Sequence, residues 1–255
     1  MHLIDVPLEQ LAGLSSRLNP TALFEALIRA RAADRTRDRP SFSARHRQRN
    51  SFARGLNATI AVSREELCAA DDLVKRRYAS RGYRVDARAL ERSALGETAN
   101  SAITLIASDA VGETVGTMTL GLDGPEGLLV DDVYGIELVA ARAAGRRVCE
   151  LTRLAVDERA DSRTVLATLF SLAFLLGRAI HRATDVFIEV NPRHVAFYER
   201  ALGFMVAAGE QICRRVKAPS VLLRLDTEKL EERLRSFGIG SLDDGLAPPA
   251  LPARE

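Results

Sequence analysis

The sequence contains no tryptophan, few other aromatic residues, only three cysteines and no long apolar run. Cys68, Cys149 and Cys213 are odd in number and widely spaced, which favours free thiols in a reducing cytoplasm over a framework of disulfides. No apolar run reaches the ~18 residues that a membrane-spanning helix needs. The N-terminus also lacks the basic and then apolar plan of a signal peptide. We therefore expect a cytoplasmic protein without a transmembrane segment.

Glycine-rich nucleotide-binding motifs are absent as well. The sequence has neither G-x-G-x-x-G nor a Walker A motif, and its predicted elements do not begin with repeated β-α-β units, so we exclude a Rossmann domain. His181 and His194 have no cysteine or carboxylate partner at metal-ligand spacing, so we expect no metal site. Cys149 has no histidine placed near it, and we interpret it as structural rather than as a nucleophile.

The charge that is present is unevenly distributed. Hydrophobic residues make up 47% and charged residues 27% of the chain, as in a globular protein, and the net charge is +2. Residues 29–54 nevertheless hold nine arginines against Asp34 and Asp38, a local charge of +7. This run fits either a solvated linker or a surface that attracts an anionic partner. Because only Phe42 and Phe52 interrupt it, we do not predict nucleic-acid binding.

Periodicity and turn residues divide the chain into three parts. Residues 1–54 are predicted to form a helical and arginine-rich extension, residues 55–238 a catalytic domain, and residues 239–255 a loose tail. Within the domain, strands and helices alternate. Strands are expected at 58–62, 101–108, 113–122, 147–156, 185–190, 204–216 and 220–226, and helices at 63–80, 132–144, 162–182, 192–202 and 227–237. This order predicts a mixed α/β sheet that is antiparallel early and parallel at 147–190.

The strand at 147–156 carries two charges where a buried strand should carry none. Glu150 and Arg153 lie in an otherwise apolar and β-branched run that leads directly into a crossover helix. Ligands bind at the carboxyl end of such a strand in open α/β sheets. Strand periodicity places Glu150 and Arg153 on opposite faces, so both reach one site only if a β-bulge intervenes. The alternative is a buried ion network with a structural role.

Three stretches resemble the long-chain N-acyl amino acid synthases, a family of GNAT-like acyltransferases related to the autoinducer synthases. In residues 190–204 an asparagine, Asn191, precedes Tyr198 by seven residues and Gly-Phe follows. Residues 149–156 contain an E-x-x-R strand, and residues 115–128 contain a V-G-T-x-x-L strand followed by a Pro-Glu-Gly loop. The resemblance covers about 58–226. It implies a GNAT-like, mostly antiparallel sheet with parallel, splayed strands at 147–156 and 185–190.

The resemblance also implies roles for residues of the site. Amide formation from a thioester needs a proton acceptor, a donor to the carbonyl oxygen and a proton for the thiolate. Glu150 is expected to act as the base through water and Arg153 to assist it. Tyr198 is expected to protonate the thiolate or to position pantetheine. The acyl group and pantetheine are expected to lie against Leu154, Ala155, Asn191 and Phe197, with a backbone N–H near Leu154 or Ala155 polarising the thioester.

The acyl donor is predicted from a difference between this sequence and the CoA-dependent GNAT enzymes. CoA-dependent members place a glycine-rich turn after the central strand to cradle a pyrophosphate. Here residues 157–165 contain no glycine and three acids, which argues against acetyl-CoA. An acyl-carrier protein needs only its phosphopantetheine arm and a basic docking patch, so we expect no resident cofactor. The arginines that could form this patch, or could be merely solvated, are Arg159, Arg163, Arg178 and Arg182.

The acceptor end is matched less fully. Arg77 and Tyr78 resemble part of an R-Y-x-V-F segment of the autoinducer synthases, and Tyr83 follows. Ser80, Arg81 and the absence of tryptophan depart from that family and weaken a homoserine-lactone product. We predict transfer of a fatty acyl group from acyl-carrier protein to the α-amine of an amino acid. The alternatives are an autoinducer synthase, a CoA-dependent acetyltransferase and a non-catalytic binding module. The sequence leaves a homo-oligomer open.

Overall fold

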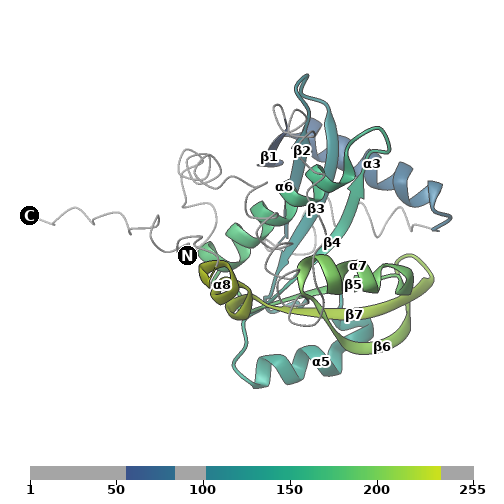
Figure 1. The fold of residues 1–255 in the computed structure, drawn as a ribbon. Coiled ribbons are helices and arrows are strands. Elements are labelled where there is room, and N and C mark those ends of the chain that lie inside the picture. Colours follow the sequence, from purple (N-terminus) through teal and green to yellow (C-terminus); the bar gives the residue numbers. More distant parts are fainter. Residues whose placement is uncertain (1–55, 84–101, 237–255) are drawn as a thin grey trace, which may run out of the picture.

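The computed structural model of the chain describes residues 56–83 and 102–236 (Figure 1). The predicted N-terminal extension, residues 1–54, and the predicted tail, residues 239–255, lie outside the described residues. The remainder is built on one sheet of seven strands in the order β1-β2-β3-β4-β5-β7-β6. The strands are β1 Asn57–Ile60, β2 Ala102–Ser108, β3 Thr114–Leu122, β4 Val148–Val156, β5 Asp185–Val190, β6 Met205–Cys213 and β7 Ala218–Asp226.

Neighbouring strands run antiparallel except β4 and β5, which are parallel. The parallel pair requires a crossover, and the chain between its two strands supplies one, as the sequence predicts. The predicted fold class, a mixed and mostly antiparallel sheet with a parallel pair at its centre, is confirmed. The predicted strand boundaries differ from the observed ones by a few residues.

Local sequence signals set the helix ends. Helix α3, Arg64–Ser80, begins with the predicted capping box: the Ser63 hydroxyl accepts from the Glu66 N–H at 3.1 Å, and the Glu66 carboxylate accepts from the Ser63 N–H at 2.9 Å. Helix α5, Asp131–Ala143, is followed by Gly145, whose φ of 73° lets the chain turn back into β4. Helix α8, Thr227–Ser236, follows β7 directly.

Helices cover both faces of the sheet. Leu105 and Ala107 of β2 pack in the same core cluster as Val165 and Leu169 of the crossover helix, whereas Ile106 between them packs with Ala70 of α3. Since alternate strand residues point to opposite faces, the crossover helix and α3 lie on opposite sides (Figure 1). Helix α5 packs on Phe187 of β5.

Two predicted helices are less regular than expected. The predicted helix 162–182 is an α-helix, α6 Ser162–Phe174, that continues as a π-helix, η3 Leu175–Ile180. The predicted helix 192–202 consists of a 3₁₀ turn η4 Pro192–His194, a short α7 Val195–Phe197 and a π-turn η5 Tyr198–Leu202 that ends at Gly203. Apolar periodicity identifies the buried face but does not distinguish these hydrogen-bond patterns.

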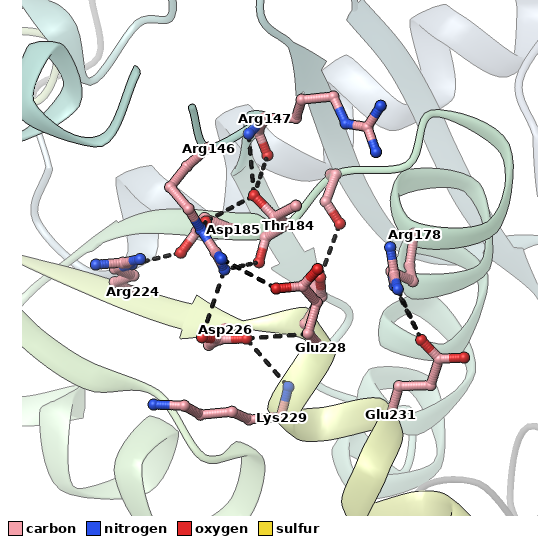
Figure 2. Close-up of polar contacts among 12 residues, drawn as sticks. Arg146, Arg147, Arg178, Thr184, Asp185, Arg224, Asp226, Glu228, Lys229 and Glu231 are labelled. Atoms are coloured by element: carbon pink, nitrogen blue, oxygen red, sulfur yellow. Dashed lines mark hydrogen bonds and ion pairs between the residues drawn. The ribbon is translucent and has the colours of Figure 1, made fainter. Parts of the chain in front are cut away.

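An ion network fastens the amino ends of β4 and β5 (Figure 2). The fully buried Asp185 carboxylate pairs with Arg146 and Arg224 and accepts from the Thr184 hydroxyl at 2.8 Å. Arg146 also donates to Glu228 of α8 at 3.0 Å. These contacts join β5, β7, α8 and the residues just before β4. The charged side chains at this end of the sheet therefore hold these elements together.

Candidate active site

A β-bulge interrupts the central strand at the predicted place. Thr119 of β3 pairs with Thr152, but Thr117 pairs with Ala155, so two residues of β4 lie opposite Met118 alone. The first of these two, Arg153, has a φ of 54°, the left-handed conformation that a bulge can impose on its first residue. The bulge that the sequence analysis required for Glu150 and Arg153 is therefore present.

Strands β4 and β5 separate just beyond this point. Their parallel pairing runs from Val148 with Asp185 to Leu151 with Ile188 and then ends. The residues that follow on each strand, Thr152–Val156 and Glu189–Asn191, line a cavity of about 460 Å³. The end of parallel pairing thus opens the sheet at the carboxyl ends of its central strands, where the sequence predicts a ligand site.

The cavity has an apolar wall and a polar wall. Apolar side chains come mainly from β4, α6 and the segment after β5: Leu154, Val156, Leu166, Phe170 and Phe197. Polar side chains come from α3, the end of β5 and the β6–β7 hairpin: Tyr78, Glu189, Cys213, Arg215 and Ser220. A cavity of this size with one apolar side and a few convergent polar groups is typical of a small-molecule site.

Arg153 lines the cavity and is tied to helix α3. Its guanidinium pairs with Asp71, and both side chains are largely buried, with 7% and 13% exposed. A buried guanidinium needs such a partner to offset its lost hydration. Arg153 therefore has the structural pairing that the sequence analysis named as the alternative, although it also faces the cavity.

Glu150 lies beside the cavity but is not among its lining residues. One carboxylate oxygen accepts from the Leu129 N–H and the other from the Val130 N–H, both at 3.0 Å, and the residue is 2% exposed. Its side chain lies over Gly121, where a Cβ atom would come within 2.8 Å of the Glu150 Cγ. Burial raises the pKa of the Glu150 carboxyl, although Arg215 and the two N–H groups oppose this shift. The loop before α5 therefore covers this carboxylate, and its role as the base stays a prediction.

The predicted pantetheine residues meet at the cavity. Leu154, Ala155, Asn191, Phe197 and Tyr198 all line it. The Asn191 side chain caps η4 and donates to the Pro219 carbonyl at 3.3 Å. The Tyr198 ring packs edge-on against Phe170, Phe197 and Phe204, and burial raises the pKa of its hydroxyl. A tyrosine with a raised pKa remains protonated and can donate a hydrogen bond, although it is a weaker acid.

The predicted acceptor residues also lie at the cavity. Arg77, Tyr78 and Tyr83 line it, and the two tyrosine rings contact each other edge to face. Burial raises the pKa of Tyr78 to about 12, while the Arg215 guanidinium opposes this rise. Arg77 donates to Glu158 at 2.9 Å, and Arg193 donates to the Tyr83 hydroxyl at 3.0 Å.

The four predicted docking arginines do not form one patch. Arg159 and Arg163 lie at the start of the crossover, whereas Arg178 and Arg182 lie at its far end. At 1.5 Å per helical residue the two pairs are roughly 25 Å apart. Arg178 is also engaged by Glu231 of α8, at 2.9 Å. Hydrogen bonds from the Arg159 N–H and guanidinium lower the pKa of Asp157 to about 2, so the turn after β4 keeps a carboxylate.

The sequence analysis missed the polar wall formed by Glu189, Arg215 and Ser220. Glu189 pairs with Arg215 and accepts from the Ser220 hydroxyl at 2.6 Å, while Arg215 also donates to the Leu129 carbonyl at 2.7 Å. A charged residue near the end of the predicted strand 185–190 was the available signal. Its partners come from a hairpin that sequence periodicity alone does not place beside it.

The described residues contain neither a metal centre nor a membrane span. Within 56–83 and 102–236, no group of three or more His, Cys, Asp or Glu residues could hold a metal ion. None of the helices in these ranges is both long enough and apolar enough to cross a membrane.

Comparison with known proteins identifies relatives. The family model of the N-acyl amino acid synthase FeeM matches residues 69–226, more than half of the chain. The solved structure of FeeM, an N-acyl amino acid synthase from uncultured soil microbes, superimposes with a TM-score of 0.63 and 28% identity, covering 71% of this chain and 96% of FeeM. No curated protein matches by sequence.

Acetyltransferase structures are similar at a lower level. A variant of spermidine N-acetyltransferase SpeG from Vibrio cholerae gives a TM-score of 0.49 at 14% identity, covering 70% of this chain and 98% of SpeG. FdhC, a nucleotide-linked sugar GNAT, gives 0.48 at 10% identity, covering 72% and 94%. The resemblance drawn from the three sequence stretches is confirmed by the family match. The chain belongs to the FeeM family of N-acyl amino acid synthases and is an acyltransferase with a GNAT-like fold.

Proposed function

We propose that the enzyme transfers a fatty acyl group from the phosphopantetheine thioester of an acyl-carrier protein to the α-amine of an amino acid. The observation that carries this proposal is the cavity between the splayed ends of β4 and β5, which is lined both by apolar side chains and by polar ones. A fatty acyl thioester and a zwitterionic amino acid need these two environments side by side. The family match supports the same reaction.

The donor arm would enter where β4 and β5 separate. Beyond Leu151 the edge of β4 no longer pairs with β5, so its backbone groups can bind the amides of a pantetheine arm. The thioester carbonyl would lie at the bulge, where an N–H near Leu154 or Ala155 polarises it. The acyl chain would follow the apolar wall toward Leu166 and Phe170.

The turn after β4 favours a carrier protein over CoA as donor. Asp157 accepts from the Arg159 N–H at 2.9 Å, so that amide already has an anionic partner. Asp157, with its lowered pKa, and Glu158 and Asp161 would repel a diphosphate at this turn. A carrier protein presents a single phosphate on its own surface and does not need a pyrophosphate cradle.

The acceptor would approach from the polar wall. Tyr78 and Tyr83 would cover it, and Arg77, which lines the cavity, would attract its carboxylate. In the reaction the amine nitrogen forms a bond to the thioester carbon, and the carbon–sulfur bond breaks. Tyr198 would donate a hydrogen bond to the departing thiolate, since burial raises the pKa of its hydroxyl and keeps it protonated; the proton that the thiolate takes up comes from the amine.

The test is a product assay with the full chain. Purified enzyme is incubated with a long-chain acyl-carrier protein, with the matching acyl-CoA or with acetyl-CoA, together with a mixture of the twenty amino acids and S-adenosylmethionine, and products are identified by mass spectrometry. We expect an N-acyl amino acid, formed faster from the carrier protein. A lactone formed from S-adenosylmethionine, or an acetylated product formed only from acetyl-CoA, would contradict the proposal.

A further inference from the structure

Two carboxylates lie next to the point where the central strands β4 and β5 separate, and only one of them lines the cavity. Glu150 of β4 has both oxygens bound by backbone N–H groups and is covered by the loop before α5. Glu189 of β5 is a lining residue of the cavity. It comes one residue after Ile188, the last residue of β5 that pairs with β4, so it lies where the strands begin to separate.

Glu189 is held in one orientation by two partners. One carboxylate oxygen accepts from the Ser220 hydroxyl at 2.6 Å, and the other pairs with Arg215. Arg215 is fixed in turn by its bond to the Leu129 carbonyl, and the Ser220 carbonyl accepts from the Tyr134 hydroxyl at 2.7 Å. Each carboxylate oxygen has two lone pairs, so this arrangement leaves capacity for a further donor.

The charges around Glu189 favour a cationic ligand. Glu150 and Glu189 both act on Arg215, and their carboxylates raise the pKa of its guanidinium against the effect of burial. Two carboxylates around one guanidinium leave a net negative charge, so this group attracts an ammonium and repels a further carboxylate. The Glu189 side chain is only 3% exposed, and an ammonium that replaced water in the cavity would meet it in a medium of low dielectric constant.

We propose that Glu189 is the catalytic residue that binds the α-ammonium of the acceptor and takes its proton, with Arg215 and Ser220 as positioning residues. This inference rests on the proposed function. The ammonium gives one proton to Glu189, and the freed nitrogen lone pair attacks the thioester carbon. A carbon–nitrogen bond replaces the carbon–sulfur bond. The second N–H proton goes to the departing thiolate, and Glu189 later releases its proton to solvent.

The test compares Glu189→Gln with the wild type across pH. Glutamine keeps the size of the side chain and an oxygen for Ser220, but it cannot accept the proton. We expect kcat/KM for the amino acid to fall about 10²–10⁴-fold near neutral pH, the range typical of a lost general base. Above the pKa of the acceptor's amine the free amine is already present, so most of this loss should disappear. The KM for the acyl donor should not change.

Glu150→Gln tests the other candidate base, the one that the sequence analysis predicts, with the same substitution on the neighbouring strand. We expect it to keep the pH profile of the wild type. Glu189→Asp should recover part of the activity, and circular dichroism of each variant checks folding. A Glu189→Gln enzyme with wild-type kcat/KM, or with an equal loss at every pH, would overturn the inference.

The outcome also separates the two proposals. If the wild type makes no N-acyl amino acid from any donor, the proposed function fails. If the wild type makes the product, but the loss of kcat/KM that disappears above the pKa of the amine is seen in Glu150→Gln and not in Glu189→Gln, only the assignment of Glu189 fails.

Discussion

The two ends of the β4–β5 pair both concentrate charge, but they use it differently. At the amino end, Asp185 is fully buried between Arg146 and Arg224, and α8 closes over the network (Figure 2). At the carboxyl end, Glu189 pairs with Arg215 on the wall of a cavity. Similar ion pairs therefore lie in a packed region at one end and on the lining of a cavity at the other.

Backbone pairing explains the difference. Near Asp185, β5 is paired on both sides, to Val148 of β4 and to Asp226 of β7, so the side chains pack against one another. After Ile188 the pairing to β4 ends, and the residues that follow line the cavity. A cluster of charged residues therefore indicates a site only where the strands that carry it separate. Four predictions test this contrast, beginning with the largest effect.

Breaking the amino-end network should cost stability and leave the chemistry intact. Asp185→Asn removes the charge between Arg146 and Arg224, and we expect the free energy of unfolding to fall by about 3–5 kcal/mol, as for other buried pairs that lose one partner. Urea unfolding measures this loss, and kcat per folded molecule should be unchanged.

Glu228→Gln provides the control for that experiment. Glu228 also pairs with Arg146, but 46% of its side chain is exposed, so its loss should cost less than about 1 kcal/mol. Equal losses for Asp185→Asn and Glu228→Gln would show that burial does not set the strength of this network.

Crowding Glu150 from β3 should have an intermediate effect. In Gly121→Ala the new Cβ would lie 2.8 Å from the Glu150 Cγ and 3.0 Å from its Oε1. Because two N–H groups hold that carboxylate, we expect a loss of about 1–3 kcal/mol, typical of overpacking. Thermal and urea unfolding would measure it. Gly124→Ala, where no atom lies within 4 Å of the new Cβ, should be nearly neutral; an equal loss there would exclude crowding as the cause.

The raised pKa of Glu150 predicts a pH-dependent stability. A carboxyl with a higher pKa in the folded chain stabilises the fold below its unfolded pKa, and that contribution is lost as pH rises through the folded pKa. The loss is about 1.4 kcal/mol for each pH unit that separates the folded pKa from the unfolded one. Unfolding of the wild type and of Glu150→Gln from about pH 4 to pH 8 should show the wild type losing its relative stability as pH rises. A relative gain would mean that the two N–H groups outweigh burial.

Charge reversal on the crossover should have the smallest effect on stability. Its effect on the KM for the acyl donor should depend on which end of the crossover carries the substitution. Arg163 is exposed at the start of α6, next to Ser162 of the cavity wall, and Arg182 is exposed at the far end. If the carrier protein docks near the cavity, Arg163→Glu should raise the KM for the acyl-carrier protein several-fold, and Arg182→Glu should not. Steady-state kinetics at low salt would show it. Equal changes would place docking elsewhere.

Much of the fold could be predicted from the sequence because its signals are local. The capping box of Ser63 and Glu66, the hairpin of β2 and β3, and the turn at Gly145 each depend on residues close together in the chain. The bulge at Arg153 was expected from the need to bring two residues of β4 to one place, together with the family resemblance.

The polar wall could not be predicted in the same way. Glu189 and Arg215 are 26 positions apart and meet only because β7 lies between β5 and β6 in the sheet. The covering of Glu150 depends on Leu129 and Val130, whose loop conformation has no periodic signal. The separation of the docking arginines follows from the length of the crossover, which α6 and η3 together extend beyond a single surface patch.

The bulge at Arg153 shifts the phase of the strand. Before it, Cys149 packs in the core cluster of α6, whereas after it Val156 packs there and Ala155 packs with α3, because the extra residue takes up half a repeat. Substitutions that crowd the α6 face should therefore fall at odd-numbered positions of β4 before the bulge and at even-numbered positions after it. Anyone who designs a substrate pocket on this enzyme by extending the pattern of residues 148–152 would place every later side chain on the wrong side of the sheet.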